Sequence, residues 1–148
     1  MLNLFIGLAA AFALFWIIKT KEILPSIISL GMIIGITLVI LPIETMLMPG
    51  LYIYNIFVAL AFFYGLAKKD LTIFSRIIIA LMSASIFTYW LWVFNHWHGN
   101  TVLFPIFTLL VVAFGIFSKA KLKNELGFLV ILAVDAVAIL IENWIKVN

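Results

Sequence analysis

The sequence predicts an all-α fold, a polytopic bundle of transmembrane helices. Of its 148 residues, 67% are hydrophobic and 10% are charged, with a mean hydropathy of +1.32. A soluble domain has about 45–50% apolar and about 25% charged residues. The apolar residues form six long runs with short polar breaks and no flexible linker. We therefore expect residues 1–148 to form a single transmembrane helical domain that crosses the cell membrane several times.

Six runs are the predicted spans, because a transmembrane helix needs about 20 apolar residues to cross roughly 30 Å of hydrocarbon. They cover residues 2–18, 23–42, 49–67, 72–94, 101–118 and 126–146. The connections are long enough only to join antiparallel neighbours, so we expect an up-and-down bundle. All four prolines fall at or near predicted helix ends, where a missing amide is tolerated. They are Pro25, Pro42, Pro49 and Pro105.

The distribution of positive charge predicts the orientation of the bundle. Eight of the nine cationic residues follow the first, third or fifth run or begin the next one. They are Lys19, Lys21, Lys68, Lys69, Arg76, Lys119, Lys121 and Lys123. The positive-inside rule makes this face cytoplasmic, so both termini and the loops with Glu44, His96 and His98 are expected outside. Trp90, Trp92, Trp97 and Trp144 lie near the predicted outer ends, as an aromatic belt would.

One acid, Asp135, stands in the middle of the apolar stretch ILAVDAVAILIENW, residues 131–144. At the bilayer centre an aspartate costs about 2.5–3.5 kcal/mol, so its side chain should face the other helices. The sequence offers no Lys or Arg at the same depth. Because desolvation disfavours the charged form, we expect Asp135 to hold a proton at rest or to share its charge with a bound cation.

Polar residues at a similar depth are the expected surroundings of Asp135. The centres of the other runs place Ser83, Ser85 and Thr108 near the midplane, with Asn55 and Thr37 within about one turn. Interhelical hydrogen bonds in membranes contribute only about 0.6 kcal/mol on average, so Asn or Ser would serve a purely structural purpose as well. This comparison favours proton or cation handling, with buried structural support as the alternative.

A second acid, Glu142, follows seven residues later on nearly the same helix face, about 10.5 Å farther along the axis. One interpretation is a stepping route from the outer surface to Asp135. The other places Glu142 in the solvated headgroup region, beside Trp144 and Lys146.

Two glycines in a GxxxG spacing, Gly31 and Gly35, predict a helix face that allows close backbone approach. The partner helix could belong to this chain or to a second copy. Besides the lipid bilayer, the possible partners are therefore a homo-oligomer or another membrane protein.

Several classes of chemistry lack a signature. The chain has no cysteine, and it contains no HExxH, GxSxG or glycine-rich phosphate motif, so we expect neither an enzyme nor a cofactor or metal site. The cations sit in loops, which suits lipid headgroups better than nucleic acid. The loop NHWHGN is expected to be an interfacial anchor. Metal binding, a pH response or an outer lipid-directed enzyme using His96 or His98 are its alternatives.

These observations lead to two hypotheses about function. The first is a small transporter-like or proton- or cation-linked membrane protein, with Asp135 as its protonatable centre. The second is an accessory, assembly or regulatory subunit that binds another membrane protein through its small-residue helix faces.

Overall fold

The computed structural model describes residues 2–118 and 120–147, which form six α-helices and, within these ranges, no strand. Lys119, one of the cations used above for orientation, lies outside the described residues. The helices are α1 (Leu2–Lys19), α2 (Ile23–Ile40), α3 (Glu44–Ala67), α4 (Ile73–Phe94), α5 (Leu103–Phe117) and α6 (Leu126–Val147). The predicted all-α fold with six helices is confirmed.

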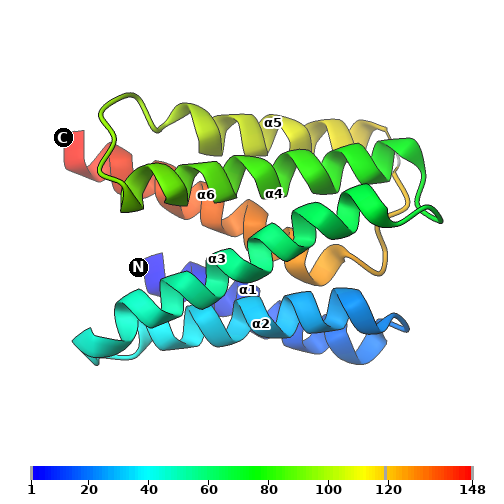
Figure 1. Ribbon diagram of the computed structural model, residues 1–148, viewed down its shortest axis with the longest axis horizontal. Helices are drawn as coiled ribbons and strands as arrows, with labels where there is room; N and C mark the ends of the chain where they lie inside the picture. The colour runs from blue at the N-terminus through cyan, green and yellow to red at the C-terminus, as the bar shows by residue number, and fades with distance from the viewer. Residues whose placement is uncertain (1, 119, 148) are drawn as a thin grey trace.

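The helices run up and down, and the two chain ends lie at the same end of the bundle (Figure 1). Each helix packs against the next one in the chain, and α6 closes the ring by packing against α1. In addition α6 contacts α2 and α4, so it touches four of the other helices. Figure 1 shows α6 passing between the α4–α5 pair and the α1–α2 pair. Side chains on α6 are therefore placed to meet several helices at once.

Four helices are long and apolar enough to cross a membrane: α2, α3, α4 and α6. The apolar parts of α1 and α5 are shorter, and the 15 residues of α5 rise only about 22 Å. The helix boundaries lie within two residues of the predicted ones except at the start of α3. Helix α3 begins at Glu44, five residues before its predicted start, so Pro49 lies inside the helix and not at its end, where it removes one intrahelical hydrogen bond. Helix α5 begins late, at Leu103, after Asn100 Oδ1 accepts from the Val102 amide at 3.1 Å.

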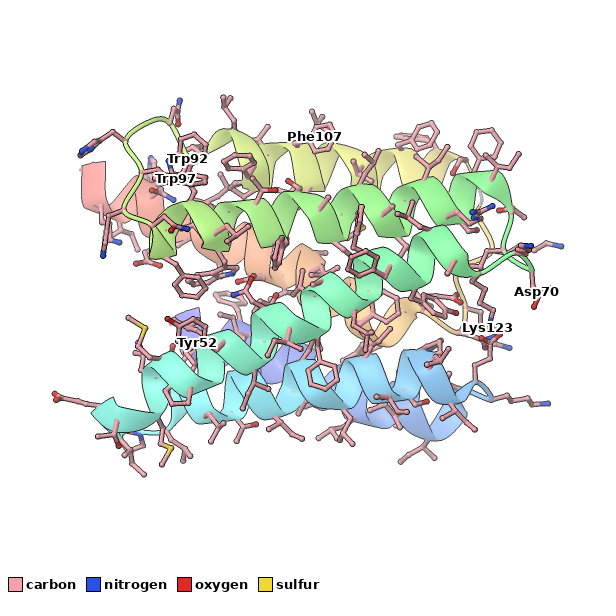
Figure 2. The ribbon with its side chains drawn as sticks, in the orientation of Figure 1. Tyr52, Asp70, Trp92, Trp97, Phe107 and Lys123 are labelled. Atoms are coloured by element: carbon pink, nitrogen blue, oxygen red, sulfur yellow. The ribbon has the colours of Figure 1, made fainter. Side chains whose placement is uncertain are left out.

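Large apolar side chains cover the outside of the bundle. Ile18 is 84% exposed and Phe117 is 83% exposed, and Phe107 on α5 points away from the other helices (Figure 2). Soluble monomers rarely expose large contiguous apolar areas. An apolar exterior around four span-length helices is compatible with a membrane protein.

The glycines of the GxxxG face pack inside the bundle, against α3. A Cβ added to Gly31 would lie 2.3 Å from the Phe57 ring. One added to Gly35 would lie 2.7 Å from the backbone nitrogen of Tyr54 and 2.9 Å from the carbonyl oxygen of Gly50. Helices α2 and α3 therefore approach backbone to backbone, and only glycine fits at position 35.

Candidate functional site

Asp135 lies inside the bundle, with 6% of its surface exposed. Two donors from different helices reach the same carboxyl oxygen. The Tyr54 hydroxyl on α3 donates to Oδ2 at 2.8 Å, and the Trp90 indole N–H on α4 donates to Oδ2 at 3.2 Å. Among the described residues no hydrogen bond reaches the other oxygen, Oδ1. The site thus holds the carboxyl group in place and leaves one oxygen available.

A cleft of about 160 Å³ ends at this carboxyl group. Five helices line it, all except α5. The lining residues are Asn3, Ile6, Ile36, Val39, Ile40, Leu51, Tyr54, Trp90, Asp135, Ala138, Ile139 and Glu142. Asn3 and Glu142 are exposed, whereas Tyr54 and Asp135 are buried, so the cleft leads inward from the end that holds the chain termini.

The two acids of α6 line this same cleft, Glu142 at its exposed end and Asp135 at its buried end. Glu142 also forms an ion pair with Lys146, with 2.7 Å between Oε1 and Nζ, and both side chains are largely exposed. Such an exposed pair four residues apart contributes about 0.3–0.5 kcal/mol. Asp135 is therefore the buried acid of the cleft, and Glu142 lies at its exposed mouth.

The hydroxyl and amide side chains expected around Asp135 make no hydrogen bond to it. Asn55 donates to the Leu51 carbonyl at 3.0 Å, and its own Oδ1 is buried without a partner. Ser85 and Thr108 both donate to the Phe104 carbonyl, at 2.7 and 3.1 Å, which joins α4 to α5.

Of the remaining two hydroxyls, only that of Thr37 makes a hydrogen bond among the described residues. Thr37 donates to the Ile33 carbonyl at 2.8 Å, and Ser83 Oγ is buried with no partner among the described residues. Hydroxyl and amide side chains on helices commonly bond to the carbonyl one turn back, and this local bond competes with longer-range ones. A predicted depth similar to that of Asp135 was therefore not enough to identify its hydrogen-bond partners.

Sequence reasoning missed the two residues that do hold Asp135, Tyr54 and Trp90. In a chain with 16% aromatic residues, a single tyrosine or tryptophan looks like packing or an interfacial anchor. Their polar atoms were the available signal, because a buried tyrosine hydroxyl or indole N–H usually finds a hydrogen-bond partner.

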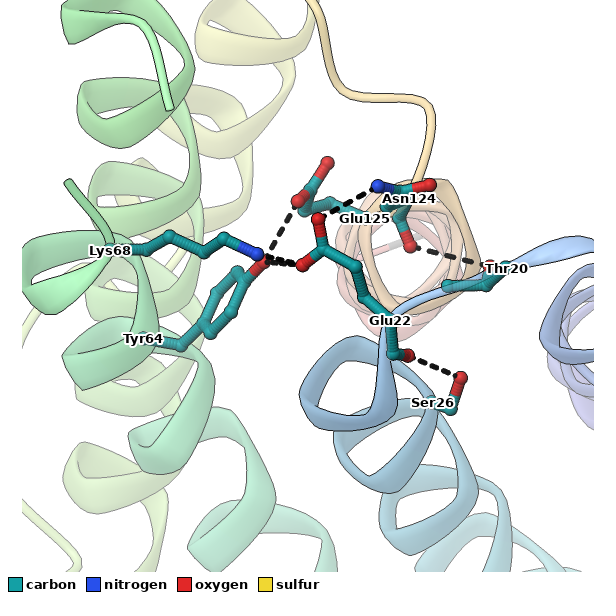
Figure 3. A network of polar contacts seen from close by, with 7 residues as sticks. All are labelled: Thr20, Glu22, Ser26, Tyr64, Lys68, Asn124 and Glu125. Carbon is teal, nitrogen blue, oxygen red and sulfur yellow. Dashed lines mark hydrogen bonds and ion pairs between the residues drawn. The ribbon is translucent and has the colours of Figure 1, made fainter. Parts of the chain in front are cut away.

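A second polar cluster closes the opposite end of the bundle, and Figure 3 shows it from close by. Glu22 forms an ion pair with Lys68 and accepts from Asn124 Nδ2 at 2.9 Å. Tyr64 lies between two acids, with its hydroxyl 2.9 Å from Glu125 Oε1 and 3.3 Å from Glu22 Oε2. Glu125 is 1% exposed, and it was missed because the sequence places it in a polar loop. We call these five residues the lysine-end network.

Two tyrosine–acid pairs join α3 to α6 and to the residue just before it, with the same spacing along both segments. Tyr54 meets Asp135 and Tyr64 meets Glu125, ten residues apart in both segments, or about 15 Å. Fully buried apolar side chains occupy the positions between the pairs: Val58 and Ala61 on α3, and Phe128 and Leu132 on α6. An apolar layer therefore separates the cleft from the lysine-end network.

The histidine loop stands apart from both clusters. His96 and His98 are exposed, and His96 has a left-handed backbone with φ of 50°. Within the described residues no three His, Asp or Glu side chains gather in a way that could hold a metal ion.

No protein-family model, curated protein or solved structure matches the chain. Its function is therefore argued from the cleft and the residues that line it.

Proposed function

We propose that this protein is a small transporter-like membrane protein in which Asp135 binds a proton or a small cation. The observation that carries the proposal is the cleft that ends at a buried carboxyl group with one unpartnered oxygen. Ionisable groups at membrane depth are costly, and they mark ion pathways and proton relays more often than structural supports. The chain crosses the cell membrane in six spans, including the shorter α1 and α5, which local thinning of the bilayer accommodates.

The two ends of the bundle differ, and this difference supports a carrier and not an open channel. On one side the cleft leads to Asp135, and on the other the apolar layer and the lysine-end network block the path. A carrier that opens alternately to each side needs one such closed end in each state. In this proposal the structure corresponds to the state that is open toward the chain termini.

The direction of opening follows from the charges. The loops at the closed end carry most of the lysines, which the positive-inside rule places in the cytoplasm. The termini and the mouth of the cleft are then outside, and Asp135 receives its proton or cation from that side.

The alternative, an accessory subunit that binds another membrane protein through Gly31 and Gly35, has less support. Both glycines are buried against α3 of the same chain, so a partner helix could reach them only by displacing α3. No other observation favours this alternative.

The test is ion movement in proteoliposomes that contain a pH-sensitive dye and carry an imposed membrane potential. We expect the wild-type protein to move protons, or sodium followed as a tracer, and Asp135→Asn to abolish the movement because it removes the ionisable group. Asp135→Glu should retain part of it.

Asp70→Asn is the matched control, since Asp70 is an exposed acid in the turn between α3 and α4. It should move ions as the wild type does. Equal ion movement by the wild type and Asp135→Asn would contradict the proposal.

A further inference from the structure

The cleft at Asp135 has the features of a site for a particular class of cation. Three properties narrow the class: the charge of its lining, the number of oxygen atoms near Asp135, and the shape of the space. The inference drawn from them rests on the proposed function and adds the chemistry of the ligand.

The charge of the lining excludes an anionic ligand. Two carboxyl groups line the cleft, and none of its described lining residues is Lys, Arg or His. Lys146 is paired with Glu142 at the exposed mouth and does not line the cleft. An anion at the inner end would meet Asp135 with no compensating charge, whereas a cation would meet an opposite charge in a poorly solvated place.

The supply of oxygen atoms disfavours a bare metal ion. Hard cations such as Ca²⁺ take about six to eight oxygen ligands. The inner end of the cleft offers only the Asp135 carboxyl group and the Tyr54 hydroxyl, and the residues around them are mainly aliphatic. A metal ion would have to keep most of its water among Ile36, Val39 and Ile139, whose aliphatic side chains offer it no ligand.

The shape and the aromatic wall suit an organic cation. An apolar cavity of about 150 Å³ can hold benzene, so a cleft of 160 Å³ has room for about six to eight non-hydrogen atoms. Trp90 and Tyr54 stand beside the carboxyl group, so aromatic rings form part of the wall that an organic cation would contact.

We propose that the cleft binds a small organic ammonium ion, whose N–H donates to Oδ1 of Asp135 while its apolar body lies among Ile36, Val39 and Ile139. Oδ1 is the right acceptor because Tyr54 and Trp90 both donate to Oδ2 and leave it unpartnered. Asp135 can hold either a proton or the ammonium group at this oxygen, but not both. Binding of the ammonium ion to the carboxylate then displaces the Asp135 proton into the cleft, which is the exchange that a coupled carrier requires.

The test uses isothermal titration calorimetry on the full chain in lipid nanodiscs. The probes are n-butylammonium chloride, n-butanol, sodium butyrate and sodium chloride at matched ionic strength. We expect saturable binding of n-butylammonium alone, and a loss of about tenfold or more in affinity for Asp135→Asn, because a hydrogen bond to a charged group is removed. Asp70→Asn, an exposed acid-to-amide change, should bind as the wild type does.

A second variant tests the same site in case Asp135→Asn does not fold. Val39→Phe leaves the acid and both donors in place but adds volume to the cleft wall, so it should also abolish n-butylammonium binding. Full affinity in either variant would overturn the assignment. Equal binding of n-butanol, tighter binding of butyrate, or displacement by sodium at equal concentration would also overturn it.

The results of this test and of the proteoliposome test together distinguish failure of the ligand class from failure of the proposed function. Ion movement that depends on Asp135 without n-butylammonium binding would remove the ligand class and leave the proposed function in place. Absence of both would remove both.

Discussion

At the scale of single residues, two donors offset the cost of burying Asp135. A buried carboxyl group without hydrogen bonds would be strongly unfavourable, and Tyr54 and Trp90 each supply one bond from a different helix. Both bonds end at the same oxygen, so the arrangement fixes the side chain without satisfying it fully. That combination of fixed position and unused acceptor is what a binding residue needs.

The Tyr54 bond can be removed alone. Tyr54→Phe deletes the hydroxyl that lies 2.8 Å from Oδ2, and we expect a loss of about 0.6–1.7 kcal/mol in the free energy of unfolding, from the average to the largest value measured by double-mutant cycles for hydrogen bonds between membrane helices. Titration with sodium dodecyl sulfate in mixed micelles measures it. Tyr52→Phe, at an exposed position two residues earlier, should change stability little. Equal stabilities of the two variants would show that the Tyr54 bond contributes nothing.

The residue scale is also where sequence reasoning reached its limit. The position of Asp135 in its run identified it as the acid to follow, because helix type and depth follow from an apolar run. Its partners depend on how each helix is rotated, which depth does not reveal. Ser85 and Thr108 lie near the predicted midplane but bond to Phe104, whereas Tyr54 lies nearer the predicted outer end of its run and reaches Asp135. One sequence feature could have indicated the two tyrosine–acid pairs. The spacing is ten residues both between Tyr54 and Tyr64 and between Glu125 and Asp135.

At the scale of helices, the packing of α2 on α3 positions the donor Tyr54. Gly35 lies against the Tyr54 backbone and Gly50, so the two helix axes approach closely where the cleft begins. The sequence predicted a close-packing face there and left its partner open, since a GxxxG spacing does not specify which helix it meets.

A methyl group at Gly35 tests this packing. Gly35→Ala would place Cβ 2.7 Å from a backbone nitrogen that cannot rotate away, so we expect a loss of about 1–3 kcal/mol in the free energy of unfolding. Gly7→Ala is the matched control, because nothing lies within 4 Å of its added Cβ. The same micelle titration compares them. If Gly35→Ala proved as stable as Gly7→Ala, the described α2–α3 contact would be wrong.

The lysine-end network joins the helices at the closed end. Lys68 follows α3 and pairs with Glu22, which precedes α2, and Tyr64 reaches Glu125 beside α6.

Lys68→Met leaves Glu22 without its cation, and we expect about 1–2 kcal/mol of destabilisation, because the pair is only partly buried. Lys69→Met removes an exposed cation next in sequence and should cost little. Thermal unfolding in detergent compares the two variants, and equal midpoints would contradict a structural role for the network.

At the scale of the whole molecule, the chain combines an apolar exterior with polar groups gathered at two levels inside. The helix positions followed from hydropathy, whereas the start of α5 follows a local hydrogen bond to Asn100 and α3 extends past Pro49 to Glu44. The cleft arises because the backbones of α3 and α6 do not pack directly within the described residues, so the Tyr54 side chain spans the space between them.

The orientation of the whole molecule has its own test, helped by the absence of cysteine. A cysteine introduced as His98→Cys should react with a membrane-impermeant maleimide on intact cells, because its loop is expected outside. Asp70→Cys, at the opposite end, should react only after the cells are opened. The reverse pattern would show that the cleft opens toward the cytoplasm.

The central claim is that water reaches the cleft from the outer side and stops above the apolar layer. Two valine-to-cysteine variants measure this directly: Val39→Cys in the cleft wall and Val58→Cys, at a fully buried position between the two tyrosine–acid pairs. Intact cells are treated with a charged, membrane-impermeant methanethiosulfonate reagent, and the modified fraction is measured by mass spectrometry. The account predicts modification of Val39→Cys and none of Val58→Cys; an unreactive Val39→Cys, or equal modification of both, would contradict it.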